Sequence, residues 1–242
     1  MKQYRYVNRL SLRNRVTRMA WGVVWALLFR PTPRWALHCW RRGLLRAFGA
    51  TVGAGCRIDP SARIWLPSNL CLGDYVAIAE DADIYCVAPI TIGSKTTVSQ
   101  RAFLCTASHD ITRLTRPLTM APIDIGDHVW IAAEAMVYPG ACLGEGAVVA
   151  ARGVFRGTAA PWTIHAGNPG RQVGMRQLVD ALAGHPAEDS GSAEALQSPE
   201  SGPQSSLQIG TGRTGTVKVG TDIGVCETPN LGVNASAARS GT

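Results

Sequence analysis

The sequence predicts an all-β fold, a parallel β-helix built from hexapeptides, and three observations support this prediction. Gly or Ala often follows a recurring aliphatic residue, and another small or compact residue often lies four positions after it. Aromatic residues make up only 7% of the chain, whereas it has 26 glycines, which suits a narrow aliphatic core. The aliphatic residue recurs every six positions in four runs: Val52, Ile58, Ile64; Leu72, Ile78, Ile84; Ile92, Val98, Leu104; and Ile125, Ile131, Val137, Leu143, Val149.

A period of six over about a hundred residues is typical of hexapeptide β-helices. Three hexapeptides form one triangular coil of about 18 residues, and coils stack at the strand spacing of about 4.8 Å. The aliphatic residue points into the prism, and the small residues lie at its corners. An amphipathic helix would need apolar residues three and four apart, and a surface strand would need strict alternation. We therefore assign residues 51–170 to a β-helix domain.

The segment that precedes the repeats, residues 1–50, is basic and rich in tryptophan. It holds eleven Lys and Arg, no acidic residue and four of the seven tryptophans, in a chain of net charge +7. Two apolar stretches, residues 19–29 and 35–48, predict helices separated by Pro31 and Pro33. These helices either cap the open end of the β-helix or lie in the headgroup layer of a membrane. Nucleic-acid binding is not expected, because the cations lie on an apolar segment.

The apolar stretch at residues 19–29 is too short to span a bilayer, which needs roughly 20 residues. It also begins too far from Met1 for a secretory signal peptide. We therefore expect a cytoplasmic protein, at the inner face of the cell membrane if the helices contact lipid. Four cysteines in the repeats are interpreted as small buried hydrophobic residues of a reduced protein, namely Cys71, Cys86, Cys105 and Cys142.

Two further segments follow the repeats. Residues 171–183 predict a short terminal helix. Residues 184–242 are rich in Gly, Ser, Pro and Thr and contain no aromatic residue. Such a composition buries too little apolar surface to order the chain, so we expect a disordered tail.

The chemistry is expected where the repeat is interrupted, at residues 105–124. A β-helix accommodates an insertion only as a loop extruded from a corner, and such loops often carry function. His109 lies at the root of this loop between Ser108 and Asp110, where an imidazole would be partly exposed and titrate near neutral pH. His109 is therefore the candidate catalytic residue. Cys105 is a competing nucleophile, but nothing in the sequence would lower its pKa.

These residues resemble the hexapeptide-repeat acyltransferases over roughly residues 8 to 175. The N-terminal segment is similar to that of the colanic-acid-type exopolysaccharide O-acetyltransferases in particular. The motifs that carry the resemblance are Ser108-His109-Asp110 with its loop, Pro122-Ile123-Asp124-Ile125-Gly126-Asp127-His128-Val129-Trp130-Ile131, Ala166-Gly167-Asn168-Pro169, Arg30-Pro31-Thr32-Pro33-Arg34 and Trp40-Arg41-Arg42.

The resemblance implies a left-handed β-helix that forms a homotrimer with active sites between subunits. It implies that His109 is a general base, which removes the proton from an acceptor hydroxyl as the oxygen attacks the thioester of acetyl-CoA. No covalent enzyme intermediate is needed, so a ternary complex is expected. Acetyl-CoA is the expected cosubstrate, and the expected acceptor is a saccharide, lipid-linked or nucleotide-linked, of envelope or exopolysaccharide biosynthesis.

The resemblance also assigns the remaining site residues. Asp83 and Trp130 would contact the acceptor or the acetyl group, and Asp110 would orient the imidazole. The Ala133 N–H would stabilise the thioester oxygen, and Ala151 would let the pantetheine arm approach closely. Arg156 and Arg171, with Arg176 as a third candidate, would meet the CoA phosphates. Relatives often read Thr-Lys-Asp where this chain reads Arg156-Gly157-Thr158.

Three other functions remain open at this point. An acyltransferase of the same fold would act on an amine or a small alcohol such as an antibiotic. A zinc enzyme on the same β-helix would need three converging histidines, and the chain has five histidines but no HxxxxH pair. No metal is therefore expected. A non-catalytic scaffold is the last alternative.

Overall fold

The aliphatic residue that begins each hexapeptide is buried in the computed structural model, which describes residues 11–178. All fourteen of these residues are at most 6% exposed. The small residues four positions later are buried as well, from Ala62 to Ala147. The six-residue period therefore corresponds to one buried position in each face of a β-helix, and the predicted fold class is confirmed.

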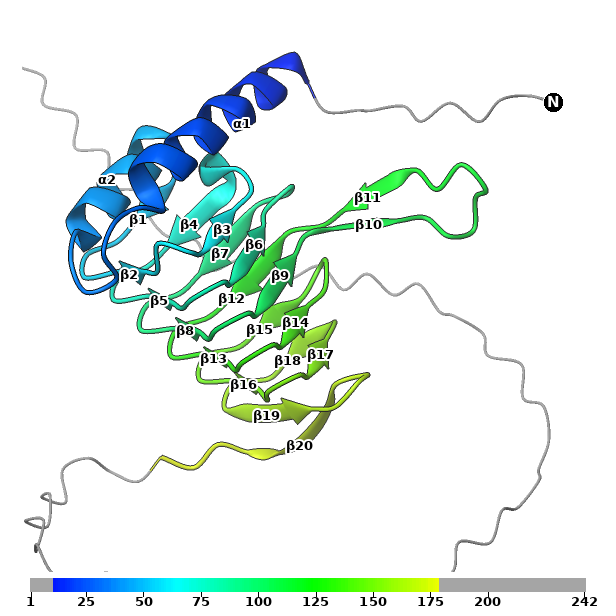
Figure 1. Cartoon of the computed structure of the whole chain (residues 1–242). Helices are drawn as coiled ribbons and strands as arrows, with labels where there is room; N and C mark the ends of the chain where they lie inside the picture. Colours follow the sequence, from blue (N-terminus) through cyan, green and yellow to red (C-terminus); the bar gives the residue numbers. More distant parts are fainter. Residues whose placement is uncertain (1–10, 179–242) are drawn as a thin grey trace, which may run out of the picture. The chain divides into compact units, whose positions relative to one another are not determined.

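Three sheets form the faces of the prism, and their strands pair in parallel except at one end (Figure 1). The first sheet contains β1 (Thr51–Val52), β4 (Leu70–Leu72), β7 (Ile90–Ile92), β12 (Ile123–Ile125), β15 (Cys142–Leu143) and β18 (Thr158–Ala159). The second contains β2 (Arg57–Ile58), β5 (Ala77–Ile78), β8 (Thr97–Val98), β13 (Trp130–Ile131), β16 (Val148–Val149), β19 (Thr163–Ala166) and β20 (Arg171–Met175). The third contains β3 (Arg63–Ile64), β6 (Asp83–Tyr85), β9 (Phe103–Cys105), β14 (Met136–Val137) and β17 (Val154–Phe155).

The pairing register explains why the six-residue rhythm shifts along the chain. Val52 pairs with Leu72, and Leu72 pairs with Ile92, so each of these coils has two residues more than three hexapeptides. A short 3-10 helix, η2 (Pro67–Asn69), lies at the first of these offsets. Ile92 then pairs with Ile125 across the long insertion. The coils stay in register because the insertion leaves the body of the prism instead of widening it.

Close stacking of the coils explains the glycine that often follows the aliphatic residue. A Cβ atom at Gly93 would lie 2.3 Å from Asp127 Oδ1 and 2.5 Å from the backbone of Gly126. The same Asp127 Oδ1 accepts a hydrogen bond from the backbone N–H of Ser94 at 2.6 Å. This corner therefore has room for a hydrogen bond between coils but not for a side chain.

Two helices and a π-helical turn cover the N-terminal end of the β-helix: α1 (Leu12–Val24), η1 (Trp25–Phe29) and α2 (His38–Ala47) (Figure 1). Arg41 is fully buried there. Side chains of this segment donate hydrogen bonds to carbonyl oxygens of the first coil: Trp21 Nε1 to Ile64 (2.7 Å), Trp25 Nε1 to Ala62 (2.9 Å), Arg41 Nε to Ile58 (2.7 Å) and Arg42 Nη1 to Cys56 (2.9 Å).

An open sheet edge needs partners for its backbone groups, and here indole and guanidinium groups supply them. The capping role of the N-terminal helices is therefore confirmed. Part of the basic and Trp-rich composition of residues 1–50 serves this cap. No helix within residues 11–178 is long and apolar enough to cross a membrane.

The other end of the β-helix is covered by a strand where a helix was predicted. β20 runs antiparallel to β19, with Thr163 opposite Met175. The predicted terminal helix at residues 171–183 is therefore wrong up to residue 178, and its remainder lies outside the described residues. The physical reason is that the last coil presents an unpaired edge, and Gly174 lowers the helix propensity of the segment that pairs with it. The predicted tail, residues 184–242, also lies outside the described part.

The cysteines differ in burial more than the sequence suggested. Cys86 and Cys105 are buried as expected, but Cys71 is exposed and Cys142 is half-buried. Cys71 is the middle residue of β4, and the leucines on either side of it point inward. Alternation along the strand therefore places its thiol outside the prism.

Candidate active site

The insertion predicted to carry the chemistry forms an antiparallel hairpin of β10 (Ala107–His109) and β11 (Leu118–Met120). The hairpin extends away from the coils, as Figure 1 shows. Thr106 anchors its root, because its N–H donates to the Tyr85 carbonyl at 3.2 Å and its own carbonyl accepts from the Ala121 N–H at 3.0 Å. The expected extruded loop is thus a structured arm fixed to the third sheet.

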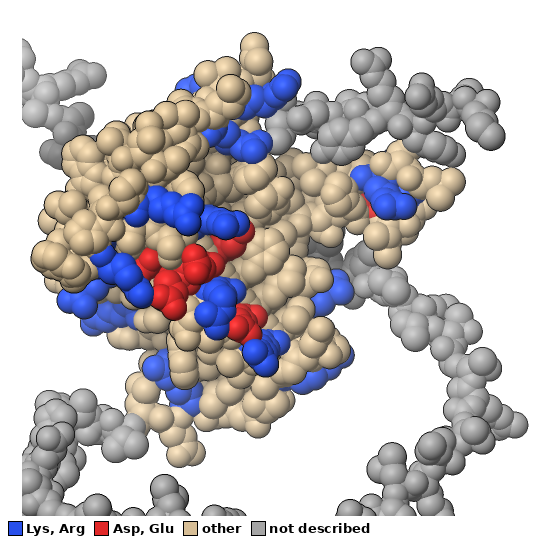
Figure 2. Space-filling view, in the orientation of Figure 1, with Lys and Arg blue, Asp and Glu red and all other residues tan. Residues whose placement is uncertain are grey.

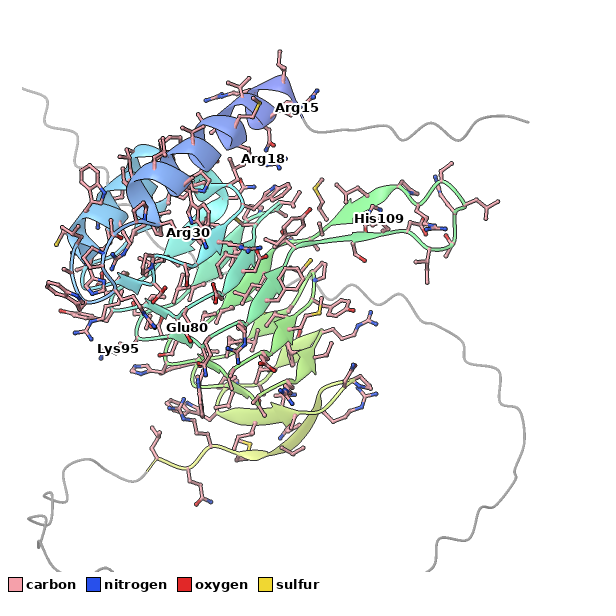
Figure 3. The ribbon with its side chains drawn as sticks, viewed as in Figure 1. Arg15, Arg18, Arg30, Glu80, Lys95 and His109 are labelled. Carbon is pink, nitrogen blue, oxygen red and sulfur yellow. The ribbon has the colours of Figure 1, made fainter. Side chains whose placement is uncertain are left out.

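His109 lies on this hairpin with its imidazole exposed (Figure 3). Its Nδ1 is 2.8 Å from the carbonyl oxygen of Arg116. A carbonyl oxygen can only accept a hydrogen bond, so this contact places the proton on Nδ1. Nε2 then carries the free lone pair. The contact with the Arg116 carbonyl therefore fixes the orientation of the ring.

Asp110 does not orient the imidazole, contrary to the prediction. Its Oδ1 accepts hydrogen bonds from the N–H and the hydroxyl of Thr112, and its Oδ2 lies 3.3 Å from Arg113 Nε. The hydrogen bonds from Thr112 lower the pKa of the Asp110 carboxyl. The physical reason is the turn itself, because an Asp at this position bonds to backbone two residues ahead. The Arg116 carbonyl takes the orienting role.

The Cys105 thiol has the properties of a structural residue. Burial raises its pKa, and its Sγ lies 3.0 Å from the carbonyl oxygen of Ala107, to which it donates. A nucleophilic cysteine needs a lowered pKa and access to solvent. The geometry therefore favours His109 over Cys105 as the reactive group.

Asp83 lies on β6, one coil before β9, the strand from which the hairpin leaves the coils. Burial raises the pKa of its carboxyl, and the positive charge of Arg63 partly offsets this. β6 pairs with β9 so that Tyr85 lies opposite Cys105. Asp83 and the hairpin that carries His109 therefore belong to the same face of the prism.

Trp130 lies on β13 in the second sheet and is 47% exposed. Its Nε1 donates to Ser99 Oγ at 2.9 Å, which fixes the ring on the outer surface of the coil. The Trp130 ring is therefore available to a bound group, and Ser99, which positions it, was not anticipated from the sequence.

Ala133 and Ala151 occupy equivalent corners of adjacent coils, since Trp130 pairs with Val148. The Arg152 N–H donates to the Ala133 carbonyl at 2.9 Å. Within residues 11–178, no backbone carbonyl accepts from the Ala133 N–H. This corner thus offers a backbone N–H donor and little side-chain bulk.

Glu134 beside this corner was missed by the sequence reasoning. It forms ion pairs with Arg101 Nη2 at 2.7 Å and with Arg152 Nε at 2.6 Å. Glu134 and Arg152 are one coil apart in the six-residue register, so their spacing in the sequence could have predicted that the two side chains lie side by side. The side chains of Arg101, Glu134 and Arg152 are all partly exposed, so their ion pairs contribute little to the free energy of unfolding. We infer that they keep the backbone of this corner in place.

The arginines predicted to meet CoA phosphates divide into two kinds. Arg156 and Arg171 are exposed. Arg176 is held in place, with Nη1 donating to the carbonyls of His128 at 2.8 Å and Gly146 at 3.2 Å. Arg156 and Arg171 are therefore the side chains that can turn toward a phosphate.

The described chain does not bring all these residues together. No hydrogen bond or ion pair within residues 11–178 joins His109 to Asp83, Trp130 or Ala133. His, Cys, Asp and Glu side chains in the same residues form no group of three or more that could hold a metal ion. His109 is the one catalytic candidate on an arm that leaves its own coils.

No family model matches the chain. Over 168 residues it is 39% identical to WcaF from Escherichia coli (strain K12), a protein named as a colanic acid biosynthesis acetyltransferase. That alignment covers 69% of this chain and 90% of WcaF. The chain is also 30% identical over 137 residues to WbbJ from the same strain, named as a lipopolysaccharide biosynthesis O-acetyl transferase, with 51% of this chain and 67% of WbbJ covered.

Among solved structures, the fold is similar to that of a hexapeptide-repeat containing acetyltransferase from Vibrio cholerae complexed with acetyl coenzyme A. The TM-score is 0.63 at 24% identity, and the match covers 70% of this chain and 92% of the other. The repeat register, the histidine hairpin and the identity to WcaF agree. The chain therefore belongs to the hexapeptide-repeat acetyltransferases.

Proposed function

We propose that this protein transfers an acetyl group from acetyl-CoA to a saccharide hydroxyl in envelope or exopolysaccharide biosynthesis. The names of WcaF and WbbJ support the substrate class. The observation that carries the mechanism is the contact between His109 Nδ1 and the Arg116 carbonyl. It leaves Nε2 free to accept a proton at the exposed edge of the ring.

In the proposed reaction, His109 Nε2 takes the proton of the acceptor hydroxyl while the hydroxyl oxygen attacks the thioester carbon. A C–O bond forms, and the tetrahedral species collapses with cleavage of the C–S bond. The imidazolium returns its proton to the leaving CoA thiolate, which restores the neutral base. Both substrates are bound at once, because no group of the enzyme becomes acetylated.

The corner at Ala133 is proposed to bind the thioester end of acetyl-CoA. Its N–H is aimed at no protein carbonyl in the described residues and would stabilise the developing oxyanion. Ala151 would leave room for the pantetheine arm, and Trp130 would pack near the acetyl group. Arg156 and Arg171 would contact the CoA phosphates.

The protein is proposed to act as a homotrimer with the site between subunits. Two observations support this. The hairpin carries His109 away from its own coils, and its tip exposes two large apolar residues, Ile111 at 89% and Leu114 at 84%. A neighbouring copy would bury the tip and bring His109 to the Ala133 corner of an adjacent prism.

Contact with the inner face of the cell membrane is proposed for α1 and η1. Five apolar residues lie on one helical face and are between 57% and 74% exposed: Leu12, Val16, Met19, Val23 and Leu27. No acidic residue precedes Asp59 in the chain, so this surface has only basic neighbours from its own segment. An apolar face flanked by cations suits an anionic lipid surface.

Vesicle sedimentation tests this contact. We expect the protein to bind vesicles with anionic lipid more strongly than neutral ones, and Met19→Glu with Val23→Glu to abolish binding. Val173→Glu, at a residue that is 64% exposed on β20, is the matched control and should bind normally. Equal binding of all variants would contradict the proposed contact.

Free-thiol release from acetyl-CoA in the presence of saccharide acceptors, including polyprenyl-linked sugars, tests the proposed function. We expect His109→Asn to lower kcat by about 10²–10⁴-fold without loss of folding, since the side chain is exposed. His128→Asn is the matched control, because its φ of 58° suits Asn and its ring lies on another corner. Turnover with amines but with no hydroxyl compound would overturn the proposal.

A further inference from the structure

A cavity of about 440 Å³ lies between the N-terminal helices and the third sheet, on the face that carries Asp83. Arg18 from α1, Arg30 after η1 and Arg63 from β3 line it. Arg18 and Arg30 both lie below the helices toward the sheet in Figure 3. Asp83 is the one acidic residue in its wall. The cavity thus gathers three cations against one carboxylate.

These three arginines differ from the other arginines near them. Arg34 is paired with Asp59 at 2.8 Å and with Glu80 at 2.6 Å. In the described part of the chain, no carboxylate lies within 4 Å of the guanidinium nitrogens of the cavity arginines. Figure 2 shows basic side chains directly below α1, with acidic side chains immediately beside them. The charge of Arg63 also acts on Asp83, so the cavity keeps an excess of positive charge for an anion from outside the chain.

The walls of the cavity are fixed by aromatic contacts. The Arg18 guanidinium lies 3.4 Å from the centroid of the Trp65 ring, and Trp65 packs on Tyr85 at 4.5 Å. Trp21 and Trp25 are held by the hydrogen bonds that cap the first coil. The Nε1 of Trp65 is buried and has no hydrogen-bond partner among the described residues. Binding would require little ordering of these side chains.

We propose that this cavity binds the phosphate or diphosphate group that carries the acceptor saccharide. Guanidinium groups bind phosphate oxygens through paired, charge-assisted hydrogen bonds, and three of them match the charge of a diphosphate. Asp83 is then left to accept hydrogen bonds from sugar hydroxyls. This inference rests on the proposed function and specifies which acceptors it uses.

The position of the cavity relative to His109 fits this role. β6, in its wall, pairs with β9, from which the hairpin leaves the coils. At about 3.3 Å per residue, His109 lies roughly 13 Å along the hairpin from Cys105. A saccharide attached to a phosphate in the cavity would therefore extend over the same face toward the arm that carries the base.

The phosphate can come from a lipid carrier or from a nucleotide. The charges on α1 do not favour one of these sources over the other. Gly22 lines the cavity, and its neighbours on α1 include Met19 and Val23, which are 74% and 59% exposed. A lipid chain leaving the cavity past Gly22 would meet these apolar side chains. The shared chemistry is the phosphate, and the binding experiment separates its two sources.

Calorimetric titration of the full-length protein with three probes tests the inference: inorganic pyrophosphate, a nucleoside diphosphate sugar and a short-chain polyprenyl diphosphate sugar. We expect all three to bind, with the lipid-linked probe tightest if the carrier is a lipid and the nucleotide-linked probe tightest otherwise. Arg18→Gln, Arg30→Gln and Arg63→Gln should each weaken binding by about tenfold or more.

Gly22→Phe and Gly43→Phe form a matched pair of variants. A Cβ atom at either position meets nothing within 4 Å, but only Gly22 lines the cavity. We expect Gly22→Phe to fill the cavity and abolish pyrophosphate binding, whereas Gly43→Phe binds like the unmodified protein. Absence of binding by all three probes, or binding that Gly22→Phe and Arg63→Gln leave unchanged, would overturn the inference.

Acetyl transfer to phosphate-free saccharides separates this inference from the proposed function. If such saccharides are acetylated but no phosphate probe binds, the inference alone fails. If the probes bind in the cavity but no saccharide with or without phosphate is acetylated, the proposed function fails. If the carrier-linked saccharide is acetylated with a lower KM than the free saccharide, and Arg63→Gln removes that difference, both are supported.

Discussion

A backbone carbonyl sets the chemistry of the one catalytic candidate at the residue scale. The Arg116 oxygen, 2.8 Å from His109 Nδ1, fixes the tautomer without adding a charge beside the imidazole. A carboxylate in the same place would raise the pKa of the imidazole and favour its protonated form. Asp110 is instead bound to Thr112, so the described residues place the Arg116 carbonyl, and not a carboxylate, against Nδ1 of His109.

Asp83 gives a pH-dependent prediction for stability. Burial raises the pKa of this carboxyl, so the folded state holds its proton more tightly than the unfolded state does. The contribution of Asp83 to the free energy of unfolding is therefore fully present at pH values below its unfolded pKa. It is lost as the pH rises through its raised pKa in the folded state. We expect Asp83→Asn to melt at a higher temperature than the unmodified protein at pH 8, with the difference shrinking at pH 4.

Differential scanning fluorimetry across that pH range measures the effect. Asp81→Asn is the control, because Asp81 is exposed and its φ of 53° is one that Asn adopts readily. A melting temperature for Asp83→Asn that is lower at pH 8, or a control that shifts equally, would contradict this account. The same variant should raise the KM for the acceptor if Asp83 contacts sugar hydroxyls.

At the element scale, the N-terminal helices are part of the β-helix because their polar side chains complete its first coil. Arg41 shows this most clearly: it is fully buried, donates to Ile58, and reaches Thr32 Oγ1 at 2.7 Å and the Pro33 carbonyl at 3.1 Å. A buried guanidinium without a carboxylate partner is stable only where carbonyls satisfy its donors. The helices and the first coil therefore depend on one another.

Arg41→Met is predicted to lower the free energy of unfolding by at least about 2 kcal/mol, because several buried oxygens lose their donor at once. Urea denaturation measures the loss. Arg57→Met, at an exposed position on β2, should change stability by less than about 0.5 kcal/mol. Equal stability of the two variants would show that the carbonyls of the first coil do not need this cap.

How much the sequence could predict also depends on the element. The interior position repeats every six residues within each run, so the fourteen aliphatic residues that begin the repeats could be placed in the core from spacing alone. β20 could not, because its pairing depends on an edge that exists only once the coils are stacked. The Arg116 carbonyl is a backbone group, so its contact with His109 could not be predicted from the type of residue at position 116. His109 could be identified as a candidate because the insertion that carries it interrupts the six-residue repeat.

At the scale of the whole molecule, the described chain carries the parts of the proposed site on separate surfaces. His109 lies on an arm, and Ala133 lies at a corner between β13 and β14. Assembly of identical copies is the simplest way to close such a site, since each arm would serve the prism beside it. The exposed apolar tip of the arm is the surface that this arrangement would bury.

We predict a particle mass of three times 25.8 kDa by sedimentation velocity. Ile111→Ser with Leu114→Ser is expected to weaken this assembly and to lower kcat, because the tip no longer holds His109 against its neighbour. The melting temperature of the isolated chain should change little, since both residues are more than 80% exposed. A double variant with full activity and unchanged mass would contradict the proposed arrangement.

The different caps at the two ends have a consequence for how the molecule behaves in concentrated solution. Parallel coils are a template on which a further strand from another molecule could add, and unlimited end-to-end growth would give fibres. One terminus is blocked by indole and guanidinium groups that already occupy its acceptors, and the other by a strand running in the opposite direction. Parallel addition of further coils is therefore opposed at both ends, by side-chain hydrogen bonds at one end and by an antiparallel strand at the other.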